Sequence, residues 1–145
     1  MTYLVDTTFA IDLLNQRPYV QSVFQQLGTE GYAISILTYT ELWEGVYTNR
    51  DPKRAAIGLR AFLGDAPVLL YSRRVAQRAA RLRGQMRAQK LRLDQRAIDI
   101  LIAATALQHD LTMLTSDTDY DDIPGLTRLN PRTGYLTTNS SLPLP

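Results

Sequence analysis

The sequence predicts an α/β protein with a central parallel β-sheet of four to five strands, covered by helices on both faces. Two observations lead to this prediction. Short apolar runs typical of strands alternate along the chain with segments in which apolar residues recur at helical spacing. The strand-like runs are mostly apolar and do not alternate with polar residues, which is typical of parallel strands buried on both faces.

The strand-like runs are separated by segments long enough for helical crossovers. They cover residues 2–5, 32–37, 68–70 and 112–115, with residues 126–129 as an edge strand. In open parallel sheets, binding sites form beyond the carboxyl ends of the strands, where the strand order reverses. The residues that follow these runs are therefore the first place to look for chemistry.

Helices are expected between the strands. They cover about residues 7–14, 18–28, 38–48, 53–63, 73–90 and 95–107. Asp94 is the expected N-cap of the last helix. We expect a single domain over residues 1–131, because 145 residues suffice for one core, and a flexible, polar tail over residues 132–145.

Composition narrows the possible classes of protein. The sequence shows no apolar run long enough to cross a membrane and no secretory leader, so we expect a soluble, cytoplasmic protein. Cysteine is absent and His109 is the only histidine, which excludes Ser-His-Asp and Cys-His hydrolysis and the usual zinc sites. No Gly-x-Gly pair occurs, so a dinucleotide or Walker-type phosphate loop is not expected.

The net charge of +2 hides a strong asymmetry. Residues 73–96 hold nine Lys or Arg and one acid, whereas the rest of the chain holds seven bases and thirteen acids. Such a division indicates a basic face for an anionic partner and an acidic site elsewhere. The basic helix has an alternative reading as a solvated face, or as a contact surface for a partner protein.

Several carboxylates have both a structural and a functional reading. Asp6 follows the first strand and suits an N-cap, and Glu41 suits a capping box with Thr38. Asp117 and Asp119 follow the strand that ends near residue 115, where Asp is common in turns. Taken singly, none of these acids requires a functional explanation.

Asp99 differs, because its helix is apolar nearly all round and an ionised carboxylate there needs a partner. Arg96 could pair with it, but a bound cation explains the whole set of acids. Carboxylates brought together repel one another unless a divalent cation neutralises them, and Mg²⁺ or Mn²⁺ suits oxygen ligands. The sequence therefore predicts a metal site made by Asp6, Glu41, Asp99 and one or both of Asp117 and Asp119.

The order of these blocks resembles the PIN-domain ribonucleases, and specifically the VapC-type toxins of bacterial toxin-antitoxin pairs. Four acidic blocks carry the resemblance, and their spacing covers the chain up to Pro131. They are Leu4-Val5-Asp6-Thr7-Thr8, Thr40-Glu41-Leu42-Trp43-Glu44-Gly45-Val46, Asp99-Ile100-Leu101-Ile102-Ala103-Ala104-Thr105-Ala106 and Leu114-Thr115-Ser116-Asp117-Thr118-Asp119-Tyr120. Ile123-Pro124-Gly125-Leu126 and Leu129-Asn130-Pro131 complete the pattern.

The resemblance implies roles for these residues. Asp6, Glu41 and Asp99 are the metal-site acids, Asp6 and Asp99 being direct ligands. Asp117 is favoured as the fourth site residue, with Asp119 as a supporting candidate. Thr7 and Thr115 match hydroxyl residues that hold carboxylates or water beside the metal.

The resemblance also implies an activity and partners. The activity is Mg²⁺-dependent endonucleolytic cleavage of RNA by activated water, with Mn²⁺ as a possible substitute. The partners are a second copy of the chain and a small cognate antitoxin. The RNA backbone would be attracted by arginines of the basic helix, namely Arg73, Arg74, Arg78 and Arg81. The alternatives are a PIN-fold module that binds nucleic acid or regulates without cleaving, and a phosphatase or a nuclease that acts on DNA.

Overall fold

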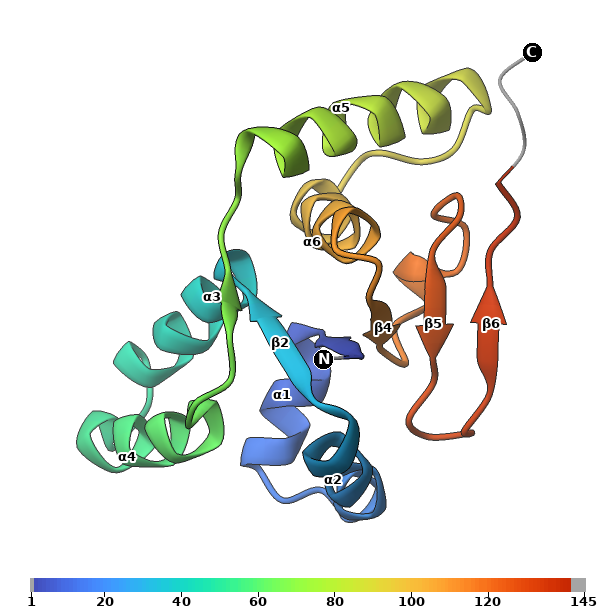
Figure 1. Ribbon diagram of the computed structural model, residues 1–145. Coiled ribbons are helices and arrows are strands. Elements are labelled where there is room, and N and C mark those ends of the chain that lie inside the picture. The colour runs from blue at the N-terminus through green and yellow to red at the C-terminus, as the bar shows by residue number, and fades with distance from the viewer. Residues whose placement is uncertain (1, 142–145) are drawn as a thin grey trace.

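The core of the protein is a six-stranded sheet, as described for residues 2–141 by a computed structural model (Figure 1). The strands are β1 (Tyr3–Val5), β2 (Tyr32–Ser35), β3 (Val68–Leu69), β4 (Thr112–Leu114), β5 (Thr127–Leu129) and β6 (Leu136–Thr138). They lie in the order β3-β2-β1-β4-β5-β6. The first five are parallel and β6 is antiparallel to β5, which confirms the predicted α/β class and adds a strand that was not expected.

The strand order reverses at β1. The chain moves from β1 to β2 and β3 on one side, and then crosses to β4 and β5 on the other side. The carboxyl ends of β1 and β4 are adjacent, because Val5 pairs with Leu114. This is the position where an open parallel sheet leaves a crevice.

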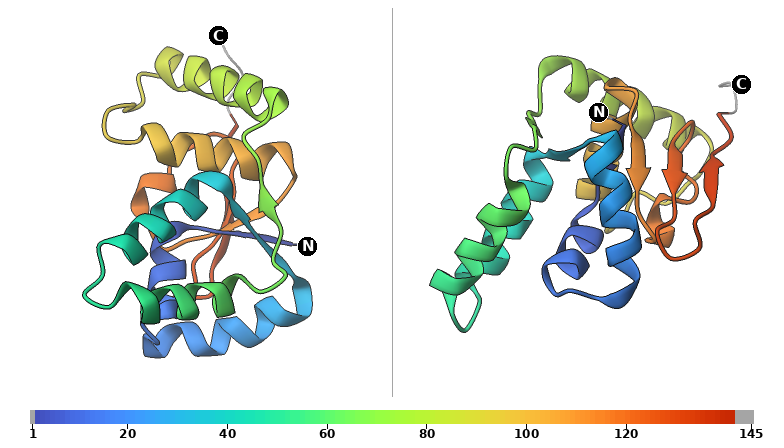
Figure 2. Two further views of the ribbon diagram at one scale, coloured as in Figure 1. Left: turned by 90° about the vertical axis from the view of Figure 1, so that its left-hand side faces the viewer. Right: turned by 60° about the horizontal axis from the view of Figure 1, so that its bottom comes forward.

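Helices cover both faces of the sheet, as the sequence predicts. They are α1 (Thr7–Leu14), α2 (Pro18–Glu30), α3 (Ile36–Tyr47), α4 (Pro52–Leu63), α5 (Arg73–Ala88) and α6 (Ala97–Gln108), with a 3₁₀ turn η1 (Thr118–Tyr120). Figure 2 shows α5 and α6 stacked on one side, and the pairs α1–α2 and α3–α4 extending from the other.

Successive side chains of β1 point to opposite faces of the sheet and so belong to two separate hydrophobic cores. Leu4 packs with the apolar side chains of α5 and α6, whereas Tyr3 and Val5 pack with those of α1 to α4. All three side chains are buried, which explains why this strand is apolar throughout. The two cores fix β1, and therefore the residue that follows it, from both sides.

Two helix starts differ from the sequence prediction. Helix α3 begins at Ile36 rather than Thr38, because Ser35 caps it and accepts the amide hydrogen of Thr38 at 3.0 Å. Helix α6 begins at Ala97, and its cap position is Arg96, without a side-chain cap bond. The prediction of Asp94 as the N-cap is therefore wrong.

The segment expected to be a flexible tail is structured over much of its length. Within residues 132–141, β6 pairs with β5, and buried Asn139 donates hydrogen bonds to the carbonyls of Tyr120 and Ile123, both at 2.8 Å. Residues 142–145 of the expected tail lie outside the described part of the chain. Because the side chains of β6 are exposed, apolar patterning gave no signal for it.

None of the helices in the described residues is long and apolar enough to cross a membrane.

Candidate active site

The candidate site lies at the carboxyl ends of β1 and β4, where the strand order reverses. Asp6 directly follows β1 and Thr115 directly follows β4. The Thr115 hydroxyl donates to Oδ2 of Asp6 at 2.5 Å, and the Asp6 amide donates to the carbonyl of Leu114 at 3.3 Å. These bonds fix the first predicted site residue against the fourth acidic block.

Asp6 is both an N-cap and a member of the acidic site. Its Oδ1 accepts the amide hydrogen of Phe9 at 2.7 Å, which confirms the capping role. Its side chain is 2% exposed. Burial raises the pKa of this carboxyl to about 7, against the bonds from Thr115 and Phe9, while the charges of Asp117 and Asp99 add to the rise.

Asp99 lies in the first turn of α6 and is half-buried. The Tyr120 hydroxyl donates to its Oδ1 at 3.2 Å. Burial raises the pKa of Asp99; the bond from Tyr120 lowers it, and the charges of Asp117, Asp119 and Glu41 raise it. The alternative ion pair between Asp99 and Arg96 is wrong, because the Arg96 guanidinium pairs with Asp122.

Three carboxylates form a tight group at this position. One oxygen each of Asp99, Asp117 and Asp119 lies within 4.8 Å of the others. The structure thus brings both candidates for the fourth site residue to the same place. Asp117 also caps η1 by accepting the amide hydrogen of Asp119 at 2.9 Å, so its predicted turn role is confirmed.

Glu41 reaches the site from the exposed side of α3. Its Oε1 accepts the hydroxyl hydrogen of Thr7 at 2.8 Å, and Thr7 is the first residue of α1, next to Asp6. The alternative role of Glu41 in a capping box with Thr38 is wrong, since Ser35 provides the cap. Its charge acts on Asp99, so Glu41 lies within electrostatic reach of the tight group.

Hydroxyl groups therefore hold three of the predicted acids. Thr115 bonds Asp6, Thr7 bonds Glu41, and Tyr120 bonds Asp99. The sequence indicated the two threonines but gave Tyr120 no role. The signal for Tyr120 was an aromatic residue directly after Asp119 in an otherwise polar stretch.

Two arginines next to the site make contacts that the sequence did not predict. Arg92 donates to Oδ1 of Asp119 at 2.8 Å, and buried Arg96 donates to the carbonyl of Asp119 at 2.7 Å. Both belong to the basic segment 73–96, where composition alone does not distinguish them from surface arginines. Their contacts depend on the fold bringing the loop before α6 against the loop after β4.

The donor set of the tight group fits a hard divalent cation. All the donors are carboxylate oxygens, which Mg²⁺ and Mn²⁺ prefer. Oxygens on opposite sides of Mg²⁺ are about 4.2 Å apart, twice the usual Mg–O distance of about 2.1 Å. The carboxylate oxygens of Asp99, Asp117 and Asp119 all lie within 4.8 Å of one another, which is near this limit. Asp6 lies beside this group, with both of its oxygens already bonded to the protein.

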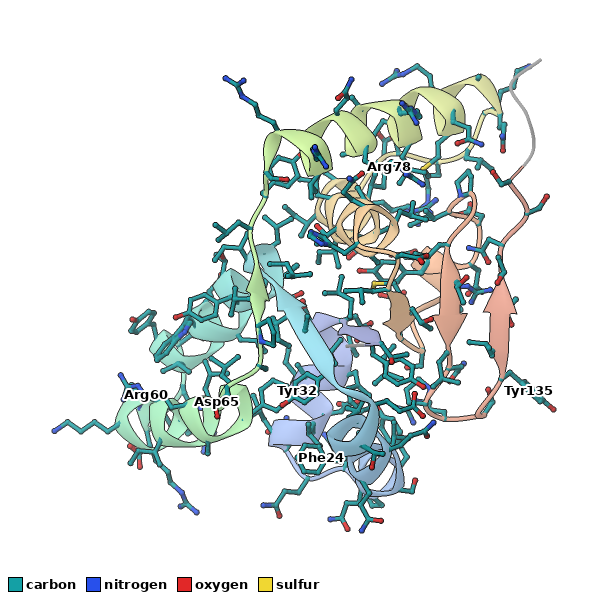
Figure 3. The ribbon with its side chains drawn as sticks, viewed as in Figure 1. Phe24, Tyr32, Arg60, Asp65, Arg78 and Tyr135 are labelled. Atoms are coloured by element: carbon teal, nitrogen blue, oxygen red, sulfur yellow. The ribbon has the colours of Figure 1, made fainter. Side chains whose placement is uncertain are left out.

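The predicted RNA-binding arginines lie on α5, which packs on α6. Arg73, Arg74 and Arg81 are exposed and Arg78 is partly exposed. Within residues 2–141, no salt bridge joins them to an acid. Figure 3 shows nitrogen-tipped side chains standing out from the outer side of α5, where the basic face meets solvent.

A groove of about 650 Å³ opens between α1, α3 and α4, and Glu41 forms part of its lining. Most of the lining is apolar. It includes Ile11, Leu14, Leu42, Val46, Ile57 and Leu59. Ile11 is 44% exposed and Ile57 is 68% exposed, so the groove presents uncovered apolar surface beside the acidic site.

Comparison with known proteins decides the family. The pattern of the PIN domain matches residues 3–126, which include every acidic block described above. The chain belongs to the PIN domain family. This confirms the resemblance to the PIN-domain family that the sequence indicated.

Several solved structures are similar to this PIN domain. A toxin-antitoxin complex from Klebsiella pneumoniae is 30% identical, with a TM-score of 0.66 over 90% of this chain and 98% of that chain. FitAcB from Neisseria gonorrhoeae is 27% identical, with a TM-score of 0.77 over 91% and 99%.

VapBC2 from Rickettsia felis, bound to a DNA fragment from its promoter, has a TM-score of 0.79 over 88% of this chain and 97% of that chain. At 23% identity it supports the fold. Among curated proteins, no match to the chain is found.

Proposed function

We propose that this PIN domain is a Mg²⁺-dependent endoribonuclease and the toxin of a toxin-antitoxin pair. One observation carries the proposal: acids from four separate segments, Asp6, Glu41, Asp99 and Asp117, gather where the strand order reverses. A site that contains neither histidine nor cysteine leaves oxygen-ligand metal chemistry as the route to hydrolysis.

The side chains have distinct roles in the proposed site. Asp99 and Asp117, with Asp119 beside them, would hold the cation, and Asp6 and Glu41 complete the negative charge around it. A bound Mg²⁺ or Mn²⁺ supplies Lewis-acid polarisation of the phosphodiester and activation of the attacking water. Thr7, Thr115 and Tyr120 keep the carboxylates in place, so little rearrangement is needed when charge develops on the phosphate.

The proposed substrate is RNA. The exposed arginines of α5 offer a basic face to a polyanion, and binding through them should weaken steeply as salt is raised. Metal chemistry alone does not distinguish RNA from DNA, so DNA has to be tested beside RNA. A homodimer and a cytoplasmic location also belong to this proposal.

The proposed protein partner is a small antitoxin. The support is the apolar groove between α1, α3 and α4, which leads to Glu41 and would allow one bound segment to cover the site. A toxin-antitoxin complex among the similar structures adds to this support. An antitoxin that occupies the groove would block access of RNA to the carboxylates.

The decisive experiment measures cleavage of total RNA by the purified protein with Mg²⁺, with Mn²⁺ and with EDTA. Asp99→Asn is the test variant, and Asp65→Asn, which changes an exposed acid after α4, is the matched control. We expect the wild type and the control to cleave with either ion and not with EDTA, and Asp99→Asn to lose more than 90% of the rate. Equal cleavage by Asp99→Asn would reject the site. No cleavage with any ion would favour a non-cleaving PIN module, and cleavage of DNA alone would reject RNA as the substrate.

A further inference from the structure

Arg92 places a fixed positive charge at the edge of the carboxylate group. It lies in the loop between α5 and α6, and its side chain is 50% exposed. Its Nη1 donates to the carbonyl of Asp94 at 2.8 Å, and its Nη2 donates to Oδ1 of Asp119 at 2.8 Å. Asp119 belongs to the tight group with Asp99 and Asp117, so the guanidinium is one carboxylate away from the candidate cation position.

The backbone beneath Arg92 is also held. Its carbonyl accepts a hydrogen bond from Nη1 of Arg96 at 2.9 Å, and Arg96 is only 2% exposed. The other terminal nitrogen of Arg96 bonds the carbonyl of Asp119. The buried guanidinium of Arg96 therefore connects the loop of Arg92 to the loop of Asp119. This connection holds the side chains of Arg92 and Asp119 next to each other.

A role in stability alone explains little of this arrangement. A half-exposed salt bridge contributes little to folding, because solvent screens it and both side chains lose freedom. The guanidinium carries five N–H donors in a planar fork, and the two bonds described leave others for a ligand. That fork matches the non-bridging oxygens of a phosphate, and one side of the side chain remains open to solvent.

We infer that Arg92 binds a non-bridging oxygen of the RNA phosphodiester held at the carboxylate group, an inference that rests on the proposed nuclease function. In this position Arg92 is a catalytic residue, because it contacts the group under attack. Its positive charge stabilises the negative charge that accumulates on the phosphate oxygens during cleavage. Asp119 then holds the arginine in the orientation that receives the phosphate.

This role predicts effects of opposite sign on two ligands. Removing the positive charge of Arg92 frees an oxygen of Asp119 and removes repulsion against a cation, so a divalent ion should bind more tightly. The same change removes a donor to the phosphate, so RNA should be cleaved less efficiently. A residue that only kept Asp119 in place would weaken both processes when replaced.

The test compares Arg92→Gln and Arg92→Lys with wild type and with Arg132→Gln. Arg132 is a matched control, since it is 57% exposed and paired with Asp12, outside the carboxylate group. Binding of Mn²⁺ without RNA is measured by calorimetry. The kcat and KM are measured at saturating Mg²⁺ on a single-stranded RNA that carries a fluorophore and a quencher, and thermal unfolding verifies that each variant folds.

For Arg92→Gln we expect the Kd for Mn²⁺ to fall about 2- to 5-fold and kcat/KM to fall about 10- to 100-fold. Arg92→Lys should lie between it and wild type, because the charge remains and the fork is lost. Arg132→Gln should change either quantity less than about 2-fold. Weaker Mn²⁺ binding by Arg92→Gln, or an unchanged kcat/KM, would overturn the inference. A wild type that cleaves no RNA would overturn the proposed function, and the inference with it.

Discussion

The hydroxyl of Thr115 donates a hydrogen bond to Asp6, 109 positions earlier in the chain. The same hydroxyl oxygen accepts the amide hydrogen of Asp117 at 3.0 Å. One side chain thus links the acid that follows β1 to the loop that carries the acids after β4. This single oxygen therefore connects Asp6 with Asp117, in addition to the pairing of β1 with β4.

Replacing Thr115 by Val should therefore impair cleavage more than folding. The change removes the donor to Asp6 and the acceptor for Asp117, and we expect kcat/KM for RNA to fall about 10-fold or more. Thr115→Ser should restore most of the rate, because it keeps the hydroxyl. Thr112→Val, at the other end of β4, is the control and should retain wild-type kcat/KM. Full activity in Thr115→Val would show that this link is dispensable.

Asp6 should make the metal-free protein less stable as pH rises. Burial raises its pKa from 3.8 to about 7, so the folded state binds the proton more tightly than the unfolded state does. This contribution to stability is complete below about pH 4 and is lost as pH rises through about 7. Urea unfolding in EDTA should therefore show that Asp6→Asn gains stability relative to wild type between pH 5 and pH 8. The gain should be on the order of a few kcal/mol or less. Parallel pH profiles for the two proteins would contradict the expectation.

Tyr120→Phe should weaken binding of the cation while leaving the fold intact. The ring is 1% exposed and packs in the core, so only the hydroxyl that holds Asp99 is lost. We expect the Kd for Mn²⁺ to rise about 3- to 10-fold, as measured by calorimetry. Tyr135→Phe removes a hydroxyl from a ring that is 74% exposed, in the turn between β5 and β6 (Figure 3), and should leave the Kd unchanged. Equal affinities in all three proteins would show that Asp99 does not need this donor.

Arg96→Met should destabilise the protein. The guanidinium donates to the carbonyls of Arg92 and Asp119 and to the carboxylate of Asp122, and methionine would leave these carbonyls without a donor. We expect a loss of about 2 to 4 kcal/mol in the free energy of unfolding, measured with urea. The control Arg73→Met, on an exposed position of α5, should change it by less than about 0.5 kcal/mol. A similar small change in Arg96→Met would mean that the two loops are held by other contacts.

Ile57→Glu should prevent binding of the antitoxin without reducing cleavage of RNA. Ile57 lines the apolar groove, so a charge at this position should disfavour binding of an apolar segment. Because the side chain is 68% exposed, the substitution should not disturb the fold. Co-purification with the product of an adjacent antitoxin gene measures the effect. Ile98→Glu, at a 45% exposed position on α6, should bind as wild type does. Loss of binding in the Ile98 variant alone would place the partner on the other face.

The sequence predicted the parallel strands and the place of the acidic residues correctly, because apolar runs give a strong signal for buried strands. Apolar runs located the five parallel strands, and the acids that follow them lie at one edge because carboxyl ends of parallel strands coincide there. The structure brings Asp99, Asp117 and Asp119 together, with Asp6 and Glu41 beside them. Which oxygens face a cation was not predictable, since this depends on donors such as Tyr120 that come from distant segments.

The errors have physical causes. A pair between Arg96 and Asp99 was the alternative to a cation because three positions separate the two residues, but the chain turns at Arg96 and its side chain reaches Asp122 instead. A capping box of Glu41 with Thr38 was the structural alternative because the spacing fits, but Ser35 accepts the amide hydrogen of Thr38 instead. Strand β6 was missed because pairing of its backbone, rather than apolar burial, holds it.

The bonds from Asn139 to the carbonyls of Tyr120 and Ile123 have a consequence for how the protein is made. Asn139 lies 19 residues after Tyr120, so it leaves the ribosome after the acids of the site have already emerged. Until Asn139 has emerged, the segment after Asp117 and Asp119 lacks the two hydrogen bonds that the Asn139 side chain donates to it. A nascent chain therefore carries every acidic side chain of the site before Asn139 can help to hold the loop of Asp117 and Asp119 in place.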